Sequence, residues 1–193
     1  MTAGYHVRPL AEATWPDFAE LVERHNGVWG GCWCMAFHTE GVGRAKTSAQ
    51  NRSAKECRVR EGRAHAALVY VGEDCVGWCQ FGPTEELPRI KHERAYLEGL
   101  SALPDWRITC FFVDREHRRS GVASAALEGA LQEIACLGAA WSRAFPRTSK
   151  AEWSRPRFST TARSRCSRAT GSTEPDASAS IAGWSAEIGR AHV

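Results

Sequence analysis

Hydrophobic and polar residues alternate over Tyr5–Leu10, which is the period of a strand with one buried face. Thr14 precedes a segment whose apolar positions recur at helical spacing to about Arg24, and threonine is a favoured helix N-cap. A second helix is predicted from Ser48 to about Glu61, with Gly62 as its stop. The chain therefore opens as strand, helix, helix, and residues 27–47 between the two helices are irregular and rich in glycine and aromatic residues.

Two apolar runs follow at Ala66–Val71 and Cys75–Phe81, and the turn sequence Gly72-Glu-Asp between them predicts an antiparallel hairpin. The next segment, Gly82–Asp105, holds prolines and many charges, and it is predicted to be a long connection with one helical turn near Glu93–Leu97. Connections of that length in compact domains are usually functional.

The stretch after this connection is the most informative part of the chain. Arg107–Val113 is rich in β-branched and aromatic residues and predicts a buried strand. From Val122 to Leu137, apolar residues recur every three or four positions, which predicts an amphipathic helix that Gly138 can end. The sequence Arg118-Arg-Ser-Gly121-Val-Ala123 joins the strand to the helix.

That junction has the chemistry of an anion site. A helix N-terminus leaves about four N–H groups unpaired and carries roughly half a positive elementary charge. Gly121 allows a tight turn and close approach of a ligand, while Arg118 and Arg119 add positive charge, so the junction suits a pyrophosphate. The same residues are also compatible with an ordinary strand-to-helix turn that has two solvated arginines.

Composition narrows the class of protein. The 193 residues are 43 % hydrophobic and 24 % charged, which fits one globular domain or one domain with an appendage. A net charge of +3 nominates no nucleic-acid or membrane partner. The N-terminus has no signal-peptide pattern and no segment is long and apolar enough to span a bilayer, so we expect a cytoplasmic protein. The eight cysteines lie mostly in apolar segments and are expected to be reduced.

The junction reads R-x-x-G-x-A and lies between a strand and an amphipathic helix. This arrangement resembles the acetyl-CoA-binding signature of the GNAT family of N-acetyltransferases, and the preceding order of elements matches that family as well. The likeness covers about residues 5–138. It implies an α/β fold, the GNAT acyl-CoA N-acyltransferase fold, with a mixed central sheet flanked by helices. It also implies that acetyl-CoA is the co-substrate and that no metal is needed.

The resemblance also assigns the cofactor contacts. The pyrophosphate would be held by the backbone of Arg118, Arg119, Ser120, Gly121, Val122, Ala123 and Ser124. The strand Phe111, Phe112 and Val113 would pair with the pantetheine arm, and the N–H of Phe112 or Val113 would polarise the acetyl carbonyl.

The catalytic groups are less clear from the sequence. Chemistry of this family needs a base for the attacking amine, and Glu85, Glu86, His92 and Asp105 are candidates, with Glu86 and Asp105 preferred. Each of them also suits a solvated surface role. Members of the family often use a late tyrosine as the acid, but no tyrosine follows Tyr96 here.

No residue pattern suggests a covalent intermediate. Cys110 lies on the predicted strand Arg107–Val113, yet no histidine lies at a spacing that would activate its thiol, so we expect this thiol to be packed in the protein. We therefore expect the amine to attack acetyl-CoA directly in a ternary complex.

The segment Gly30–His38 contains Cys32, Cys34 and His38, and two thiols with a nearby histidine can ligate zinc. A fourth ligand at the usual spacing is missing, so the favoured interpretation is core packing or the lining of an acceptor cleft.

Residues 139–193 depart most from the family. They are basic and rich in serine, alanine and arginine, and they show no sustained strand or helix period. Our hypothesis is an out-of-frame reading of the normal C-terminal part, because suitable codons for residues 141–148 in the shifted frame can give a plausible fifth strand. Coding DNA across codons 132–150 that cannot encode that alternative would refute it.

We therefore divide the chain into a GNAT-like domain, 1–138, and a basic tail, 139–193, with the C-terminal part of the fold incomplete or disordered. The function expected is acetyl transfer from acetyl-CoA to a primary amine on a small molecule, an antibiotic, an amino acid or a peptide. A homodimer is one option for its assembly. The alternatives are a CoA-binding or regulatory module without turnover, and, less favoured by charge, a tail that contacts nucleic acid.

Overall fold

The computed structural model describes residues 4–40, 46–98, 100 and 103–144, with side chains described up to residue 138. The proposed out-of-frame segment and the expected fifth strand, which would begin near residue 141, lie almost wholly outside these ranges. One compact unit, Met1–Ser142, contains all the strands described below.

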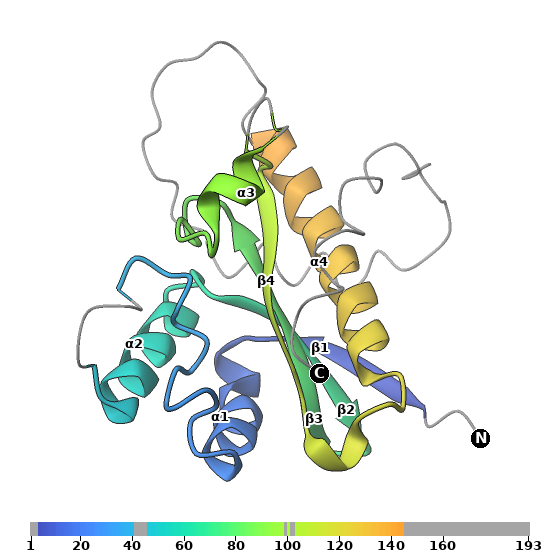
Figure 1. Cartoon of the computed structure of the whole chain (residues 1–193). Helices are drawn as coiled ribbons and strands as arrows, with labels where there is room; N and C mark the ends of the chain where they lie inside the picture. The colour runs from blue at the N-terminus through green and yellow to red at the C-terminus, as the bar shows by residue number, and fades with distance from the viewer. Residues whose placement is uncertain (1–3, 41–45, 99, 101–102, 145–193) are drawn as a thin grey trace. The chain divides into compact units, whose positions relative to one another are not determined.

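Four strands form one antiparallel sheet in the order β1-β2-β3-β4 (Figure 1). All four match strands predicted from the sequence to within two residues at each end, because short runs of apolar, β-branched and aromatic residues bounded by turn residues are typical of strands. Their bounds are Tyr5–Pro9, His65–Val71, Asp74–Pro83 and Trp106–Val113.

Helices α1 and α2 lie on one face of the sheet and α4 on the other (Figure 1). A short helix, α3, lies in the long connection, as the sequence predicts. The helix bounds are Trp15–Arg24, Ser48–Arg60, Glu93–Leu97 and Val122–Ala144.

Two helix boundaries show different physics. Thr47 caps α2, because its hydroxyl accepts the N–H of Gln50. Thr14 occupies the N-cap position of α1, but its hydroxyl accepts the N–H of Ala11 and donates to the carbonyl of Pro9 instead. It therefore fixes the turn before the helix rather than the helix itself.

The prediction that α4 ends at Gly138 is wrong, since the helix continues to Ala144. A glycine inside a helix costs only about 1 kcal/mol relative to alanine, so it does not stop a helix that packs along one side. Gly138 also lies close to the sheet, because a Cβ placed there would be 3.6 Å from Nε1 of Trp106.

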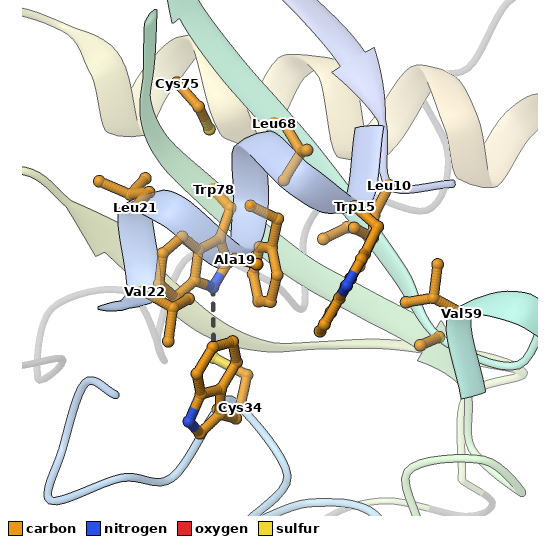
Figure 2. Close-up of a cluster of buried hydrophobic side chains, with 14 of the residues drawn as sticks. Leu10, Trp15, Ala19, Leu21, Val22, Cys34, Val59, Leu68, Cys75 and Trp78 are labelled. Carbon is orange, nitrogen blue, oxygen red and sulfur yellow. Dashed lines mark hydrogen bonds between the residues drawn. The ribbon is translucent and has the colours of Figure 1, made fainter. Parts of the chain in front are cut away.

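The core has two parts, one on each face of the sheet. The part under α1 and α2 contains large aromatic residues, among them Trp15 and Trp78 (Figure 2). The ring centroid of Trp78 lies 5.0 Å from that of Phe18. The part under α4 is built from smaller side chains: Ala67, Val69, Val76, Cys79, Phe81, Val122, Ala126 and Ala130.

Gly77 of β3 determines how close α4 begins to the sheet. A Cβ at this position would lie 2.7 Å from the carbonyl oxygen of Phe112 and 2.8 Å from Cγ1 of Val122. The absence of a side chain therefore lets the first residue of α4 pack directly on β3, beside the end of β4. Of the helices that the structure describes, none has the length and apolar character to cross a membrane.

Candidate active site

The turn between β4 and α4 is open to solvent. A 3-10 helix, η2 (Arg115–His117), leads into it, and residues 118–121 are all exposed. Gly121 has φ +98°, which residues with a side chain rarely adopt, and Arg119 is also left-handed at φ +60°. This is the geometry that the sequence predicts from the glycine in the junction.

The first N–H groups of α4 belong to the same turn. The N–H of Ala125 is bonded to the carbonyl of Gly121 at 3.0 Å. Helix geometry leaves the preceding N–H groups, those of Val122, Ala123 and Ser124, without partners inside the helix. Ala123 and Ser124 are exposed residues, like those of the turn. All seven predicted pyrophosphate residues thus lie at one helix N-terminus, where an anion is favoured, and all of them except the buried Val122 are exposed.

The outer edge of β4 leads into this turn. Among the described residues β4 is an edge strand, so one side of its backbone has no strand partner. The N–H of Asp114 is bonded to the carbonyl of Val76 at 2.8 Å. Because N–H directions alternate along an antiparallel pair, this bond orients the N–H groups of the residues before it.

In that alternation the N–H of Phe112 faces β3, whereas those of Phe111 and Val113 face the open edge. The N–H groups of Phe111 and Val113, and not that of Phe112, are therefore the ones that a carbonyl at the edge can reach. Phe112 contributes its ring instead, which stacks on Trp78 at 4.6 Å and meets His25 at 4.9 Å.

A β-bulge interrupts β4 beside this edge. The register shifts between Gln80 and Phe81, which pair with Cys110 and Ile108, so Thr109 is the extra residue. Ile108 and Phe111 pack on the α4 side, while Cys110 packs on the side of α1 and α2. Thr109 also points to the α1 and α2 side, because its hydroxyl accepts a hydrogen bond from the buried Gln80.

The four candidate bases are not equivalent. Glu85, His92 and Asp105 are exposed, and the carbonyl of Asp105 accepts the N–H of Thr84 at 3.1 Å. Glu86 is half-buried, and its Oε2 lies 3.4 Å from Nε2 of His65. That oxygen makes no hydrogen bond to the described residues. Glu86 follows β3 and Asp105 precedes β4, so both lie at the same end of the β3–β4 pair.

The cysteine-rich segment is part of the core. Cys34 is buried and accepts the indole N–H of Trp78 at 3.2 Å (Figure 2). His38 is buried too, and its Nδ1 lies 3.0 Å from the carbonyl of Glu86. No group of three metal-binding side chains occurs within the ranges given above. The zinc interpretation therefore finds no support there, and the core interpretation of Cys34 and His38 is confirmed.

This segment reaches the core through a strained backbone. Val28, Trp29, Trp33 and Cys34 all have φ between 50° and 52°, which is uncommon for residues with a side chain and an outlier for a β-branched one. Strain of this kind persists where the surrounding structure enforces it, and it concentrates at functional sites.

Cys34 brings the segment into contact with β4. Its Sγ lies 3.2 Å from Sγ of Cys110 on β4, and the hydrogen bond with Cys110 together with burial raises the pKa of the Cys34 thiol. Both cysteines are free thiols. Cys110 is thus packed against another thiol, as expected.

A buried polar cluster on the same face was missed from the sequence. Lys55 of α2 is fully buried, and its Nζ lies 2.7 Å from Oε1 of Gln80 and 3.5 Å from Nε2 of His38. Burial lowers the pKa of Lys55 to about 8 and that of His38 to about 2, where the charge of Lys55 adds to the shift. A signal was available, because α2 has no apolar stripe and its buried face carries Asn51, Lys55 and Arg58.

Comparison with known proteins assigns this fold to a family. The family model of the acetyltransferase (GNAT) family matches residues 32–145. Comparison with curated proteins gives no match.

Solved structures with a similar fold are distant. A ribosomal-protein-alanine N-acetyltransferase from Brucella melitensis is 17 % identical, with 89 % of this chain and 94 % of that chain covered and a TM-score of 0.39. An aminoglycoside N-acetyltransferase in complex with CoA is 12 % identical, with coverage of 80 % and 96 % and a TM-score of 0.46. A GCN5-related N-acetyltransferase from Ralstonia eutropha is 21 % identical, with coverage of 79 % and 98 % and a TM-score of 0.43.

The family model, rather than these structures, establishes the relationship, since it covers more than half of the chain and includes β4, the exposed turn and α4. The chain belongs to the GNAT family of acetyltransferases, and its activity is acetyl-CoA-dependent N-acetyl transfer.

Proposed function

We propose that this chain binds acetyl-CoA along the outer edge of β4 and transfers the acetyl group to a primary amine by direct attack in a ternary complex. The turn from Arg118 to Ser124 holds the pyrophosphate with its backbone N–H groups and its two arginines. The outward N–H groups of Phe111 and Val113 hold the pantetheine arm.

One observation carries this proposal. The open edge of β4 runs directly into an exposed helix N-terminus whose Gly121 has φ +98°. An extended arm with an anionic end matches that arrangement, because the edge offers N–H groups in a row and the turn offers positive charge. An outward N–H beside the thioester stabilises the negative charge that develops on the carbonyl oxygen during attack.

Glu86 is the better supported base of the two preferred candidates. Its half-buried carboxylate has an oxygen without a hydrogen bond among the described residues, whereas Asp105 is exposed. We expect Glu86→Gln to lower kcat about 100-fold with little change in the KM for acetyl-CoA. Asp105→Asn serves as the comparison, and a larger loss in that variant would transfer the role to Asp105.

The acceptor class is best approached with the amines that related folds use. A ribosomal-protein-alanine N-acetyltransferase and an aminoglycoside N-acetyltransferase are among the similar structures, so the first panel contains a peptide with N-terminal alanine and several aminoglycosides. Release of CoA thiol is the readout. Binding of acetyl-CoA without release in any acceptor mixture would favour the CoA-binding module over the enzyme.

The expectation of reduced cysteines holds for the free thiols packed in the core, such as Cys34, Cys75 and Cys79, but not for Cys136, which is disulfide-bonded. On the strength of the packed thiols we place the protein in the cytoplasm. Fractionation of producing cells tests this location, and recovery from an extracytoplasmic fraction would contradict it. Light scattering of the purified chain distinguishes monomer from homodimer.

The decisive experiment is a calorimetric titration of the full chain with acetyl-CoA. We expect micromolar binding, and its loss in the double variant Arg118→Ala, Gly121→Glu. The matched control is Arg60→Ala, Gly72→Glu, which changes an exposed arginine of α2 and a turn glycine with φ +60° and an open surrounding. Equal affinity in the first variant and the wild type would refute the assignment of the turn.

A further inference from the structure

The buried ammonium of Lys55 is the least expected group in the molecule. Its side chain is fully buried, and no carboxylate of the described residues lies within ion-pair distance of it. Burying an unpaired charge is costly unless hydrogen bonds compensate it. The compensation here comes from two neutral acceptors, Oε1 of Gln80 and Nε2 of His38.

The donor directions around Lys55 are fixed by chemistry. A backbone carbonyl only accepts, so Nδ1 of His38 carries the hydrogen that goes to Glu86, and its Nε2 is free to accept from Lys55. An ammonium only donates, so the carboxamide oxygen of Gln80 must face Lys55. With a pKa of about 8, Lys55 is mostly in the ammonium form at pH 7.

The same donor-to-acceptor order continues in the hydrogen bond from Gln80 to Thr109. Since its oxygen faces Lys55, the NH₂ group of Gln80 faces Thr109 and donates to Oγ1 at 3.2 Å. The Thr109 hydroxyl therefore accepts on its inner side, and its own hydrogen has no partner among the described residues. Lys55 and Gln80 are buried while Thr109 is half-buried, so this series of hydrogen bonds runs outward from the core to β4.

Thr109, the last residue of this hydrogen-bonded series, lies on β4, along which the acetyl-CoA is proposed to bind. Thr109 is the bulge residue of β4, two positions before the outward N–H of Phe111. An arm that pairs with Val113 and then Phe111 reaches Thr109 next, at roughly 3.3 Å per residue. The hydroxyl thus lies where the proposed function puts the reactive end of acetyl-CoA.

We propose that the hydrogen bonds Lys55–Gln80–Thr109 orient the Thr109 hydroxyl so that it donates a hydrogen bond to the sulfur of bound acyl-CoA. This proposal rests on the acetyl-CoA site proposed above. Thr109 contacts the sulfur, whereas Lys55 and Gln80 act through it. The hydrogen bonds in the chain polarise one another, which strengthens the final donor.

The donor serves the step in which the thiol leaves. The nitrogen lone pair of the amine forms the C–N bond, the C–S bond breaks, and its electron pair remains on sulfur. The nitrogen gives its proton to the base, and the thiolate accepts a hydrogen bond from Thr109 before it takes a proton from water. A tyrosine acid is not required for this role.

The test uses CoA itself, so it needs no acceptor. A hydrogen-bond donor stabilises the thiolate of bound CoA, and the thiolate is the form that iodoacetamide alkylates. Full-length protein is saturated with CoA at pH 7, and alkylated CoA is quantified by chromatography, apart from any alkylated protein. Calorimetry of each variant with CoA first establishes that CoA is bound.

We expect Thr109→Val to lower the alkylation rate of bound CoA about tenfold and Thr109→Ser to keep it, because serine retains the hydroxyl. Gln80→Glu is the sharper variant. Its carboxylate pairs with Lys55 but only accepts, so it draws the Thr109 hydrogen inward and lowers the rate as Thr109→Val does. Its melting temperature should equal or exceed that of the wild type.

The outcomes separate the two proposals. If CoA does not bind a folded wild-type chain, the acetyl-CoA site is wrong and this inference with it. The contrasting outcome is that CoA binds with equal affinity to the wild type and the three variants, with the same alkylation rate in each. In that case the acetyl-CoA site stands and the role of Thr109 is refuted. A loss in Thr109→Ser equal to that in Thr109→Val would also refute it.

Discussion

The hydroxyl of Tyr5 donates a hydrogen bond to the backbone carbonyl of Ser120 at 2.8 Å. The first residue of β1 thereby holds the exposed turn before α4, although 115 positions separate the two residues in the chain. The carbonyl of Ser120 faces Tyr5 as a result, and the orientation of the peptide that enters Gly121 is restricted. The turn proposed to bind the pyrophosphate is therefore held in place from the opposite edge of the sheet.

Removing this brace should weaken the cofactor site more than the fold. We expect Tyr5→Phe to raise the Kd for acetyl-CoA a few-fold, because the bond is exposed and worth about 1 kcal/mol or less. Calorimetry gives the Kd, and denaturant unfolding gives the stability. Unchanged affinity with reduced stability would show that the bond supports only the fold.

Gly121→Ala tests the conformation of the turn. A Cβ at this position meets only Cε2 of Tyr5, at 3.8 Å, so the cost comes from the backbone at φ +98° rather than from a clash. We expect a loss of about 1–2 kcal/mol in stability and at least a tenfold weaker Kd for acetyl-CoA. Gly72→Ala is the control, since it carries a similar backbone cost at φ +60° in the β2–β3 turn and should leave the Kd unchanged.

Proline substitutions on β4 test which N–H groups face the open edge. Val113→Pro removes an outward N–H, which an edge strand tolerates, so the chain should fold and bind acetyl-CoA weakly. Phe112→Pro removes an N–H that faces β3, and we expect it to lower the melting temperature markedly. Circular dichroism with calorimetry distinguishes the two, and a reversed pattern would overturn the assignment of directions.

His38 should make the fold sensitive to mild acid. Burial lowers its pKa from 6.5 to about 2, so below pH 6.5 the unfolded chain binds a proton that the folded chain does not. Its contribution to stability is therefore complete above pH 6.5 and is lost as the pH falls toward 2. From pH 7 to pH 5 the wild type should lose about 2 kcal/mol more than His38→Gln.

Glutamine is a suitable replacement because it can donate to the carbonyl of Glu86 and accept from Lys55, as His38 does. Urea unfolding at several pH values supplies the free energies. Parallel stability curves for the two proteins would mean that folding does not lower the pKa of His38.

The local elements of this protein are determined by its sequence. Alternation at Tyr5–Leu10 and the apolar stripe after Val122 produce β1 and α4, because a period of 2 or 3.6 places apolar residues on one face whatever the rest of the chain does. The turn between β4 and α4 is equally local, since it needs only a strand, Gly121 and a helix N-terminus in succession. For that reason the family resemblance could be recognised without a structure, whereas the role of the seven turn residues stays a prediction.

Tertiary structure alone decided the rest of the site. Whether the N–H of Phe112 or Val113 is free depends on the register of β4 against β3, and the bulge at Thr109 depends on both strands. Lys55, Gln80 and Thr109 come from α2, β3 and β4, so no local pattern joins them. Hydrogen bonds between distant segments depend on where the packed core places each side chain, and the order of residues along one segment does not carry that information.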